Sequence, residues 1–333
     1  MTRAAVLGAG AWGTTFAAVL ADAGTDVTLW GRDADALAEI RDQGTHSRVL
    51  PGVSLPAGID ATTDAATALA DADIVAVALP AQHVRGIVGD MAALVPQGAV
   101  VASLMKGIEL GTHERMSQVL GETWGVGEER LTVVSGPNLA KEIATKQPTA
   151  TVIAGANPAA AELVASSTAS AYFRPYTNAD VVGVELSGAY KNVIAVGVGI
   201  ADGMGFGHNT TATVITRGLA EITRLGLALG AAPDTFSGLA GMGDLIATCA
   251  SPLSRNHQLG SAIGRGASLD DAIASTLGTA EGVKTSQSIQ ELARATGVDV
   301  PICDAVVAMI HGGEPKETVL RALLSRPRKA EGQ

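Results

Sequence analysis

The residue of this sequence with the clearest chemical potential is a lysine inside a long apolar stretch. Lys191 lies between Tyr190 and the apolar pair Val193 and Ile194, where a packed helix is expected. Burial of an ammonium group is costly unless a partner neutralises it or its pKa falls toward neutrality. A lysine that titrates near neutral pH can donate and accept protons. The alternative is a lysine whose amine reaches solvent from a helix end.

The segment 241–248 supplies two groups that can answer this charge. Asp244 and Thr248 are four residues apart, so they share one face if the segment is helical. A carboxylate and a hydroxyl directed at one amine would orient the amine and tune its pKa. Alternatively, Asp244 only caps a helix after a glycine turn. These residues alone leave both interpretations open.

The composition restricts the class of protein. The 333 residues are 47% hydrophobic and 17% charged, which predicts two globular domains with a cleft between them. The formal net charge of -10 argues against nucleic acid as a partner and means that local cations must hold any bound phosphate. No stretch has the ~18 uninterrupted apolar residues of a membrane span, so we expect none.

Cysteine and histidine positions indicate neither metal nor disulfide chemistry. Cys249 and Cys303 are far apart in the sequence, which favours the reducing cytoplasm. The six histidines have no metal-ligand spacing, so we expect no metal.

The N-terminal segment has the pattern of a dinucleotide-binding fold. An apolar strand at 3–7 leads into a glycine turn, and an alanine-rich helix is expected at 14–23. The turn consists of Gly8, Ala9, Gly10, Ala11, Trp12 and Gly13. Its glycines permit a tight turn, backbone approach to a pyrophosphate and close packing of helix on strand, while the helix N-terminus attracts the anion.

The end of the second predicted strand, at 26–30, bears on the choice of cofactor. In this fold the residue that reads the ribose lies about 20 residues after the glycine turn. Here Arg32 and Asp33 occupy that region. A guanidinium pairs with a 2′-phosphate, which favours NADP(H), whereas Asp33 keeps NAD(H) possible. As an alternative, Arg32 is only a solvated loop cation.

Further apolar strands are predicted at 72–79, 99–104, 131–134 and 149–154. Lys106 follows one of them directly, and ligands of open α/β sheets bind at this carboxyl edge. Lys106 is therefore expected to contact cofactor or substrate. Beyond residue 180 the pattern becomes helical, and 325–333 is expected to fray.

These patterns predict an α/β protein with two domains. Residues 1–180 would form a Rossmann-type, doubly wound dinucleotide-binding domain, and residues 181–333 an all-helical substrate and catalytic domain.

Taken together, the motifs resemble the bacterial NAD(P)-dependent glycerol-3-phosphate dehydrogenases over nearly the whole chain. The motifs that carry the resemblance are the glycine turn 8–13, Lys106-Gly-Ile-Glu109, Ser135-Gly-Pro-Asn138, Gly188-Ala-Tyr-Lys-Asn192, Gly203-Met-Gly-Phe-Gly-His-Asn209, Gly241-Met-Gly-Asp-Leu245, Ser254-Arg-Asn256 and Glu281-Gly-Val283. The resemblance implies interconversion of dihydroxyacetone phosphate and sn-glycerol 3-phosphate with NADP(H) or NAD(H), a role in phospholipid synthesis, and a homodimer.

The resemblance also implies roles for individual residues. Lys191 would be the proton donor and acceptor, and the residue pattern adds Asp244 and Thr248 to the catalytic group. Substrate binding would involve Lys106, Gly136, Asn138, Lys191, Asp244, Ser254, Arg255 and Asn256. Cofactor binding would involve Gly8, Gly10, Ala11, Trp12, Gly13, Arg32, Lys106, Ala140, Arg255 and Glu281.

Two positions depart from the family pattern. Serine is frequent at the position of Ala11, so a contact to pyrophosphate there must come from a backbone N–H group. The segment 45–49 lacks the aromatic residue expected before Leu50, which puts cofactor contacts from that segment in doubt.

Two other functions fit the same plan. A related 3-hydroxyacid or 6-phosphogluconate-type dehydrogenase also uses a lysine. A catalytically silent NADPH-sensing protein would share the fold without turnover, because fold alone does not fix function. The presence of Lys191, Asp244 and Arg255 together argues against the silent protein.

Overall fold

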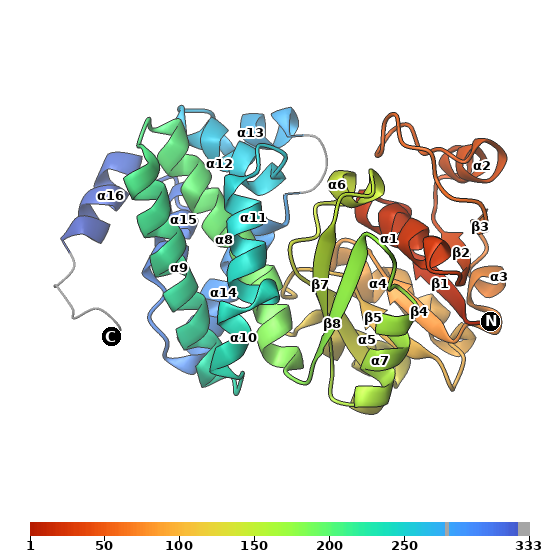
Figure 1. The fold of residues 1–333 in the computed structure, drawn as a ribbon. Coiled ribbons are helices and arrows are strands. Elements are labelled where there is room, and N and C mark those ends of the chain that lie inside the picture. Colours follow the sequence, from red (N-terminus) through yellow and green to blue (C-terminus); the bar gives the residue numbers. More distant parts are fainter. Residues whose placement is uncertain (277–279, 326–333) are drawn as a thin grey trace.

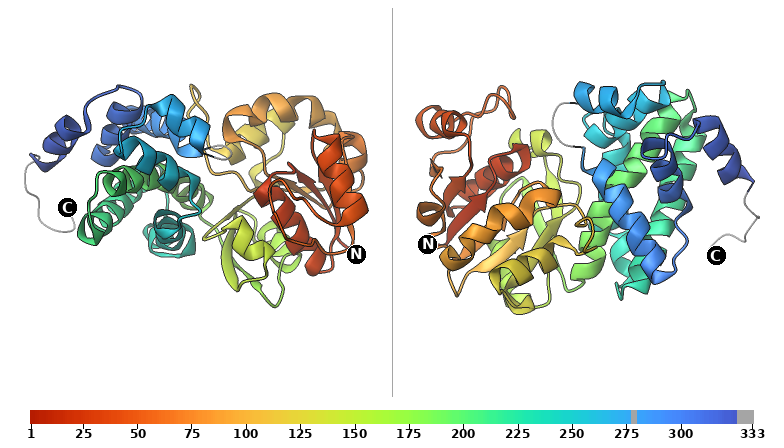
Figure 2. Two further views of the ribbon diagram at one scale, coloured as in Figure 1. Left: turned by 90° about the horizontal axis from the view of Figure 1, so that it is seen from above. Right: turned by 180° about the vertical axis from the view of Figure 1, so that it is seen from behind.

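The computed structural model describes residues 1–276 and 280–325, and the end expected to fray lies almost entirely outside this range. Figure 1 shows two lobes, one containing a sheet with flanking helices and one built only of helices. Two further views in Figure 2 show the lobes side by side, with the N-terminus and the helix at 316–324 at opposite outer ends.

The first lobe is a doubly wound sheet of eight strands in the order β3-β2-β1-β4-β5-β6-β7-β8. Strands β1 to β6 are parallel, β7 is antiparallel to β6, and β8 is parallel to β7. The order reverses between β1 and β4, which is the switch point where such sheets bind ligands. The strands are β1 (Arg3–Leu7), β2 (Asp26–Trp30), β3 (Ile59–Thr62), β4 (Ile74–Val77), β5 (Val100–Ser103), β6 (Leu131–Ser135), β7 (Thr149–Gly155) and β8 (Phe173–Asn178). The predicted fold class is therefore confirmed.

Helices cover both faces of this sheet. Alternate residues of one strand belong to different cores: Val6 packs in one cluster and Leu7 in another. This alternation is why the strands read as continuous apolar runs. The helices are α1 (Ala11–Asp22), α2 (Ala34–Gln43), α3 (Ala65–Leu69), α4 (Val84–Val88), α5 (Met116–Trp124), α6 (Ala140–Ala144) and α7 (Pro158–Ser166).

Two strands, β3 and β8, are not indicated by the sequence patterns. They lie at the two edges of the sheet, where one side of a strand faces solvent and polar residues are tolerated. After Phe173, all residues of β8 are exposed or only partly buried, and the strand contains Pro175, a residue largely confined to edge strands. Helix α1 also begins three residues earlier than expected, at Ala11.

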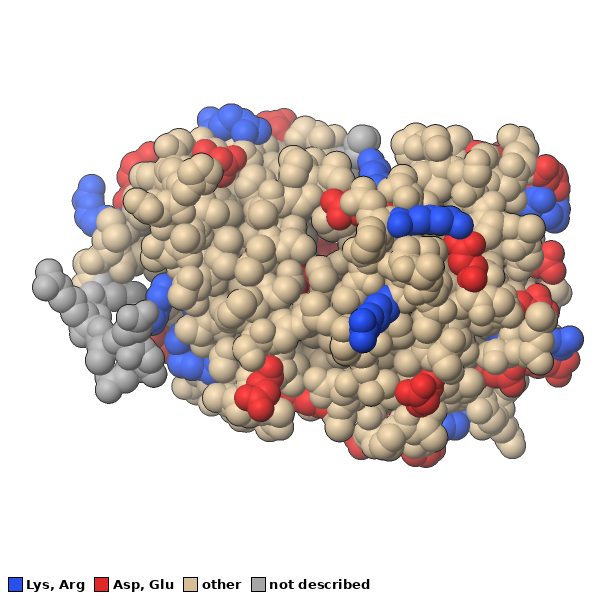
Figure 3. Space-filling model, in the orientation of Figure 1, with Lys and Arg blue, Asp and Glu red and all other residues tan. Residues whose placement is uncertain are grey.

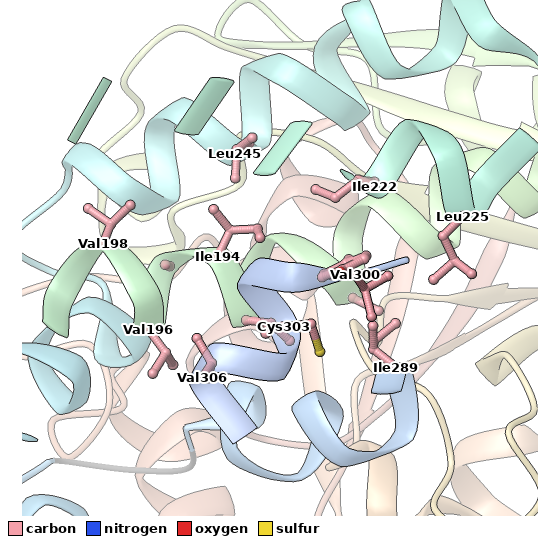
Figure 4. Packing of buried hydrophobic residues seen from close by; sticks show 14 of the residues in the cluster. Ile194, Val196, Val198, Ile222, Leu225, Leu245, Ile289, Val300, Cys303 and Val306 are labelled. Atoms are coloured by element: carbon pink, nitrogen blue, oxygen red, sulfur yellow. The ribbon is translucent and has the colours of Figure 1, made fainter. Parts of the chain in front are cut away.

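The second lobe packs around one long helix. Helix α8, 23 residues long, packs against α9, α11, α12, α14 and α15. Figure 4 shows Ile194 and Val198 of this helix among Leu245, Ile222 and Val300 from its neighbours. The helices are α8 (Val181–Gly203), α9 (His208–Ala228), α10 (Pro233–Ser237), α11 (Asp244–Ala250), α12 (Arg255–Gly264), α13 (Leu269–Ser275), α14 (Glu281–Thr296), α15 (Pro301–Ile310) and α16 (Lys316–Leu324).

Helix α8 is long and apolar enough to cross a membrane, yet 83% of its most apolar window is buried inside the fold. It begins where the Asp180 carboxylate accepts a hydrogen bond of 2.8 Å from the Gly183 N–H group. The same carboxylate accepts a bond of 2.7 Å from the Thr235 hydroxyl of α10. Because most of α8 is buried in the fold, its apolar sequence is that of a core helix.

Helices α8 and α12 cross with their backbones in contact. Gly199 and Gly203 of α8 face the main chain of α12, and Gly260 and Gly264 of α12 face the main chain of α8. A Cβ atom at Gly260 would collide with the Val196 carbonyl. This close crossing fixes the position of α12 relative to the middle of α8.

The crossing predicts that Gly260→Ala destabilises the protein. The added methyl must push two backbones apart, and overpacking of this kind costs about 1–3 kcal/mol. Calorimetry should show a lower Tm. Gly86→Ala is the matched control, because a Cβ at Gly86 in α4 meets no atom within 4 Å and alanine favours a helix by about 0.5–1 kcal/mol over glycine. Equal Tm changes in the two variants would contradict the close crossing.

Candidate active site

The amine of Lys191 lies in the buried centre of the helical lobe. Its side chain is 8% exposed, and Nζ donates hydrogen bonds to Asp244 Oδ1 and, over 2.7 Å, to Thr248 Oγ1. Asp244 and Thr248 are on α11, one turn apart, as their spacing predicts. A lysine that reaches solvent from a helix end, and an aspartate that only caps α11, are both ruled out by these contacts.

A second lysine shares the same carboxylate. Lys106, which follows β5, donates from Nζ to Asp244 Oδ2 over 2.6 Å and to the Gly136 carbonyl over 3.0 Å. Asp244 thus bridges Lys191 of the helical lobe and Lys106 of the sheet lobe. When Lys191 is protonated, two ammonium groups and one carboxylate leave one positive charge in a buried place, which suits an anionic substrate or a developing alkoxide.

A widened helical turn places Asp244. Residues Leu239–Gly243 form a π-helical turn that leads directly into α11. Gly241 lies against the Phe236 backbone, where a side chain has no room. Such turns are rare and occur frequently at functional sites.

Burial decides the protonation of Lys191. Loss of solvation lowers the pKa of its amine, Asp244 raises it, and the neighbouring Lys106 lowers it. The net result is a pKa of about 7. Both protonation states are therefore populated near neutral pH. An amine of this kind can act as general acid in one direction and as general base in the other.

A chain of side-chain amides connects the segments that carry Lys191 and Lys106. Asn256 donates to the Asn192 side-chain oxygen over 3.0 Å, and Asn192 donates to the Lys106 carbonyl over 3.2 Å. The Gly282 N–H group at the start of α14 donates to the Asn256 side-chain oxygen over 3.0 Å. Asn192 was not predicted as a site residue; its signals in the sequence were its position next to Lys191 and its place at the end of the motif Gly188-Ala-Tyr-Lys-Asn192.

The N-terminus of α12 can hold an anion. Ser254 caps the helix by accepting from the His257 N–H group over 3.3 Å, and its side chain is buried. Arg255 is the first residue of the helix and is exposed. A guanidinium beside free helix N–H groups attracts a phosphate. Because Asn256 already holds Asn192 and Gly282, it has one N–H group left for a substrate.

The glycine turn of the sheet lobe fits a dinucleotide. Gly8 has φ +121° and lies against the Ala78 carbonyl, and a Cβ at Gly13 would collide with the Gly8 carbonyl. Gly10 caps α1 without a side-chain hydrogen bond, which leaves the first N–H groups of the helix, including that of Ala11, for a ligand. The Trp12 indole N–H is buried and has no hydrogen-bond partner. The residues present therefore fit a pyrophosphate at this helix N-terminus.

The remaining predicted residues lie around this turn and the cleft. The Ala140 carbonyl at the start of α6 accepts from the Thr15 hydroxyl of α1 over 3.2 Å. The Glu281 carboxylate of α14 accepts from the Ala81 N–H group of the sheet lobe over 3.4 Å, and burial raises its pKa. Asn138 donates to the Thr151 hydroxyl over 2.9 Å, so its amino group supports the loop after β6.

Potential metal-ligating side chains do not cluster in the described part of the chain. Residues 1–276 and 280–325 contain no group of three or more His, Cys, Asp or Glu side chains that could hold a metal ion. Cys249 and Cys303 are both free and buried, and burial raises the pKa of the Cys249 thiol to about 12.

Figure 3 shows acidic and basic side chains dispersed over the face in view, without a continuous basic patch.

Comparisons with known proteins agree with this geometry. The family model for the NAD-dependent glycerol-3-phosphate dehydrogenase N-terminus matches residues 3–161, and that for its C-terminus matches residues 180–321. The chain belongs to this family. It is 54% identical over 329 residues to the glycerol-3-phosphate dehydrogenase [NAD(P)+] of Streptomyces griseus. This alignment covers 99% of this chain and 98% of that protein. The corresponding protein of Corynebacterium diphtheriae is 52% identical over 327 residues and covers 98% and 99%.

A solved structure of a family member has the same fold over its whole length. The glycerol-3-phosphate dehydrogenase of Coxiella burnetii matches with a TM-score of 0.92 and 32% identity, over 98% of this chain and 99% of that one. The present chain is therefore an NAD(P)-dependent oxidoreductase with the family's two-domain plan. Membership sets aside the 3-hydroxyacid and 6-phosphogluconate types. The residue roles stay predictions, because none of the comparisons tests them.

The pKa of Lys191 predicts opposite pH profiles for the two directions. Ketone reduction needs the ammonium form, so its kcat/KM should be high below pH 7 and fall as pH rises through about 7. Alcohol oxidation needs the neutral amine, so its kcat/KM should rise over the same range. Asp244→Asn removes the group that raises this pKa, so both limbs should move to lower pH. Limbs at the same pH in this variant would contradict the assignment to Lys191.

Proposed function

We propose that this chain interconverts dihydroxyacetone phosphate and sn-glycerol 3-phosphate by hydride transfer with NADP(H) or NAD(H), supplying glycerol 3-phosphate for phospholipid synthesis. The observation that carries the proposal is the buried Lys191 amine, held by Asp244 and Thr248 with its pKa near neutrality. Family membership supplies the substrate and the cofactor.

Lys191 moves the proton in this mechanism. A nicotinamide, when bound, supplies or accepts the hydride. In the reducing direction the Lys191 ammonium donates its proton to the substrate carbonyl oxygen as that oxygen becomes an alkoxide. Asp244 and Thr248 hold the amine in place, and the positive charge of Lys106 stabilises the developing negative charge. In the oxidising direction the neutral Lys191 amine accepts the hydroxyl proton.

The N-terminus of α12 holds the substrate phosphate in our proposal. Arg255 offers a forked donor for two phosphate oxygens, and the Ser254 hydroxyl and the remaining N–H of Asn256 add neutral donors. The close crossing of α8 and α12 sets the separation between this site and Lys191. Gly136 and Asn138 line the substrate side beside Lys106.

The cofactor contacts are proposed on the sheet lobe and at the cleft. Gly8, Gly10 and Gly13 let the pyrophosphate approach the backbone, and the N–H groups of Ala11 and Trp12 donate to it. The adenosine end lies by Arg32. The nicotinamide end lies toward the cleft, where Lys106, Ala140, Arg255 and Glu281 are the proposed contacts.

We also propose the domain limits, cellular location and assembly expected from the sequence. Support for domains at 1–180 and 181–333 comes from the end of β8 at Asn178 and the start of α8 at Val181. Two free, buried cysteines are compatible with a cytoplasmic protein. A homodimer is proposed on the family resemblance, and light scattering of the purified chain measures its mass.

The phosphate role of Arg255 is tested by substrate selectivity. Oxidation of NADPH should occur with dihydroxyacetone phosphate and be far slower with dihydroxyacetone. Loss of hydrogen bonds from a charged group costs about 1.5–3 kcal/mol, so Arg255→Gln should lower kcat/KM for the phosphorylated substrate by roughly 10- to 100-fold. Arg265→Gln, just past the other end of α12, is the control and should have little effect. Equal rates on both substrates would remove this role.

The proton role of Lys191 is tested by two substitutions that differ in charge. Lys191→Met removes the acid and base, and kcat should fall by about 10²–10⁴ in both directions. Lys191→Arg keeps the positive charge beside Asp244 but cannot release a proton, so it should be similarly impaired. Fluorescence titration should show that both variants still bind NADPH. Near-normal kcat in the arginine variant would refute proton transfer by this residue.

A further inference from the structure

The segment between α2 and β3 brings a second arginine to the adenosine end of the site. An isolated antiparallel bridge between Thr45 and Ser54 closes this segment into a loop. Arg48 lies within the loop, and its Nη1 forms an ion pair of 2.7 Å with Asp33 Oδ2. Asp33 directly follows Arg32 in the sequence, so the partner of Arg48 is the residue next to Arg32.

Several contacts hold this loop against the glycine turn and α2. His46 is fully buried, and its Nε2 lies 3.0 Å from the Ala9 carbonyl oxygen. The Glu39 carboxylate of α2 accepts bonds of 2.7 Å from the Ser47 N–H group and 2.9 Å from the Thr45 hydroxyl. The loop therefore holds Arg48 at a fixed place on the sheet lobe.

The end of β2 meets the same residue of the glycine turn. A Cβ at Gly31 would come within 2.9 Å of the Ala9 Cβ, so Gly31 and His46 both contact Ala9. Arg32 follows Gly31 by one residue and Arg48 follows His46 by two. Both arginines therefore leave from segments packed on the turn, at the end of β2 where this fold binds the adenosine ribose.

Asp33 is already occupied by the protein. Its Oδ1 accepts the Ala36 N–H group over 3.1 Å as the N-cap of α2, and its Oδ2 pairs with Arg48. The backbone hydrogen bond and Arg48 keep the pKa of Asp33 below its usual value, so the carboxylate stays charged. A ribose 2′-hydroxyl would therefore have to share Asp33 with the Ala36 N–H group and Arg48.

We propose that Arg48 and Arg32 together bind the 2′-phosphate of NADP(H), and that Asp33 positions Arg48 instead of reading the ribose hydroxyls. This inference rests on the proposed use of NADP(H). It assigns to the loop a contact that its missing aromatic residue had put in doubt.

The charge balance favours the phosphate form of the cofactor. Two guanidinium groups and one carboxylate leave a net positive charge beside the ribose. The Arg48 side chain is 67% exposed and only its Nη1 pairs with Asp33, so its other N–H groups can bind a phosphate while Asp33 holds it. NAD(H) offers no such anion, so it leaves Arg48 paired with Asp33 and gains nothing from the second arginine.

Direct binding of two nucleotides isolates this contact. Adenosine 2′,5′-bisphosphate and 5′-AMP differ only by the 2′-phosphate, and both can be titrated calorimetrically into the full chain. Arg32→Ala and Arg48→Ala should each weaken the bisphosphate by roughly 10- to 100-fold and leave 5′-AMP unchanged. Asp33→Asn should leave 5′-AMP binding unchanged. Arg41→Ala, an exposed arginine paired with Asp42 at the other end of α2, is the matched control and should change neither affinity.

Three results would overturn the inference. They are wild-type bisphosphate affinity in Arg48→Ala, an equal loss of both nucleotides in that variant, and a weaker 5′-AMP affinity in Asp33→Asn. A Tm measured for each variant identifies any loss that comes from unfolding. Because the measurement is binding without turnover, a chain inactive on dihydroxyacetone phosphate would refute the proposed reaction and leave this result standing.

Discussion

The carboxylate of Asp244 is shared by two lysines that come from different lobes, and the arrangement of the cleft depends on this one interaction. Asp244 is 1% exposed, and an uncompensated charge at such a position would be strongly destabilising. Any relative movement of the lobes that separates Lys106 from Asp244 must therefore solvate or re-pair both groups. The same contact that joins the lobes is also where we propose that the anionic substrate binds.

Helix α8 gives this interaction a rigid frame. Nearly all of its middle is buried, so Lys191 projects from a helix held on several sides by other helices. Glycines at the crossing let the backbones of α8 and α12 pack in direct contact, and this contact fixes Arg255 of α12 relative to α8. The amides of Asn192 and Asn256 extend the frame to Lys106 and to α14. Groups that are far apart in the sequence thereby share one set of fixed distances.

Sequence patterns were sufficient to predict those parts of the molecule whose structure depends on residues close together in the sequence. The glycine turn, the buried central strands and the four-residue spacing of Asp244 and Thr248 all depend on neighbouring residues. The edge strands β3 and β8 were missed because solvent on one side removes the apolar signal. Pairings such as Lys106 with Asp244, or Arg48 with Asp33, depend on which segments meet in space, and single-residue types carry no record of that choice.

Burial is the main reason that the pKa of Lys191 is low, and the positive charge of Lys106 lowers it further. The ion pair with Asp244 acts in the opposite direction and raises this pKa. Here Lys106 takes one oxygen of Asp244 and adds its own positive charge near Lys191. Desolvation and repulsion then outweigh the remaining attraction, and the pKa falls to about 7. In the proposed mechanism the second lysine therefore has two roles: it lowers the pKa of Lys191, and its positive charge stabilises the negative charge that develops on the substrate oxygen before Lys191 protonates it.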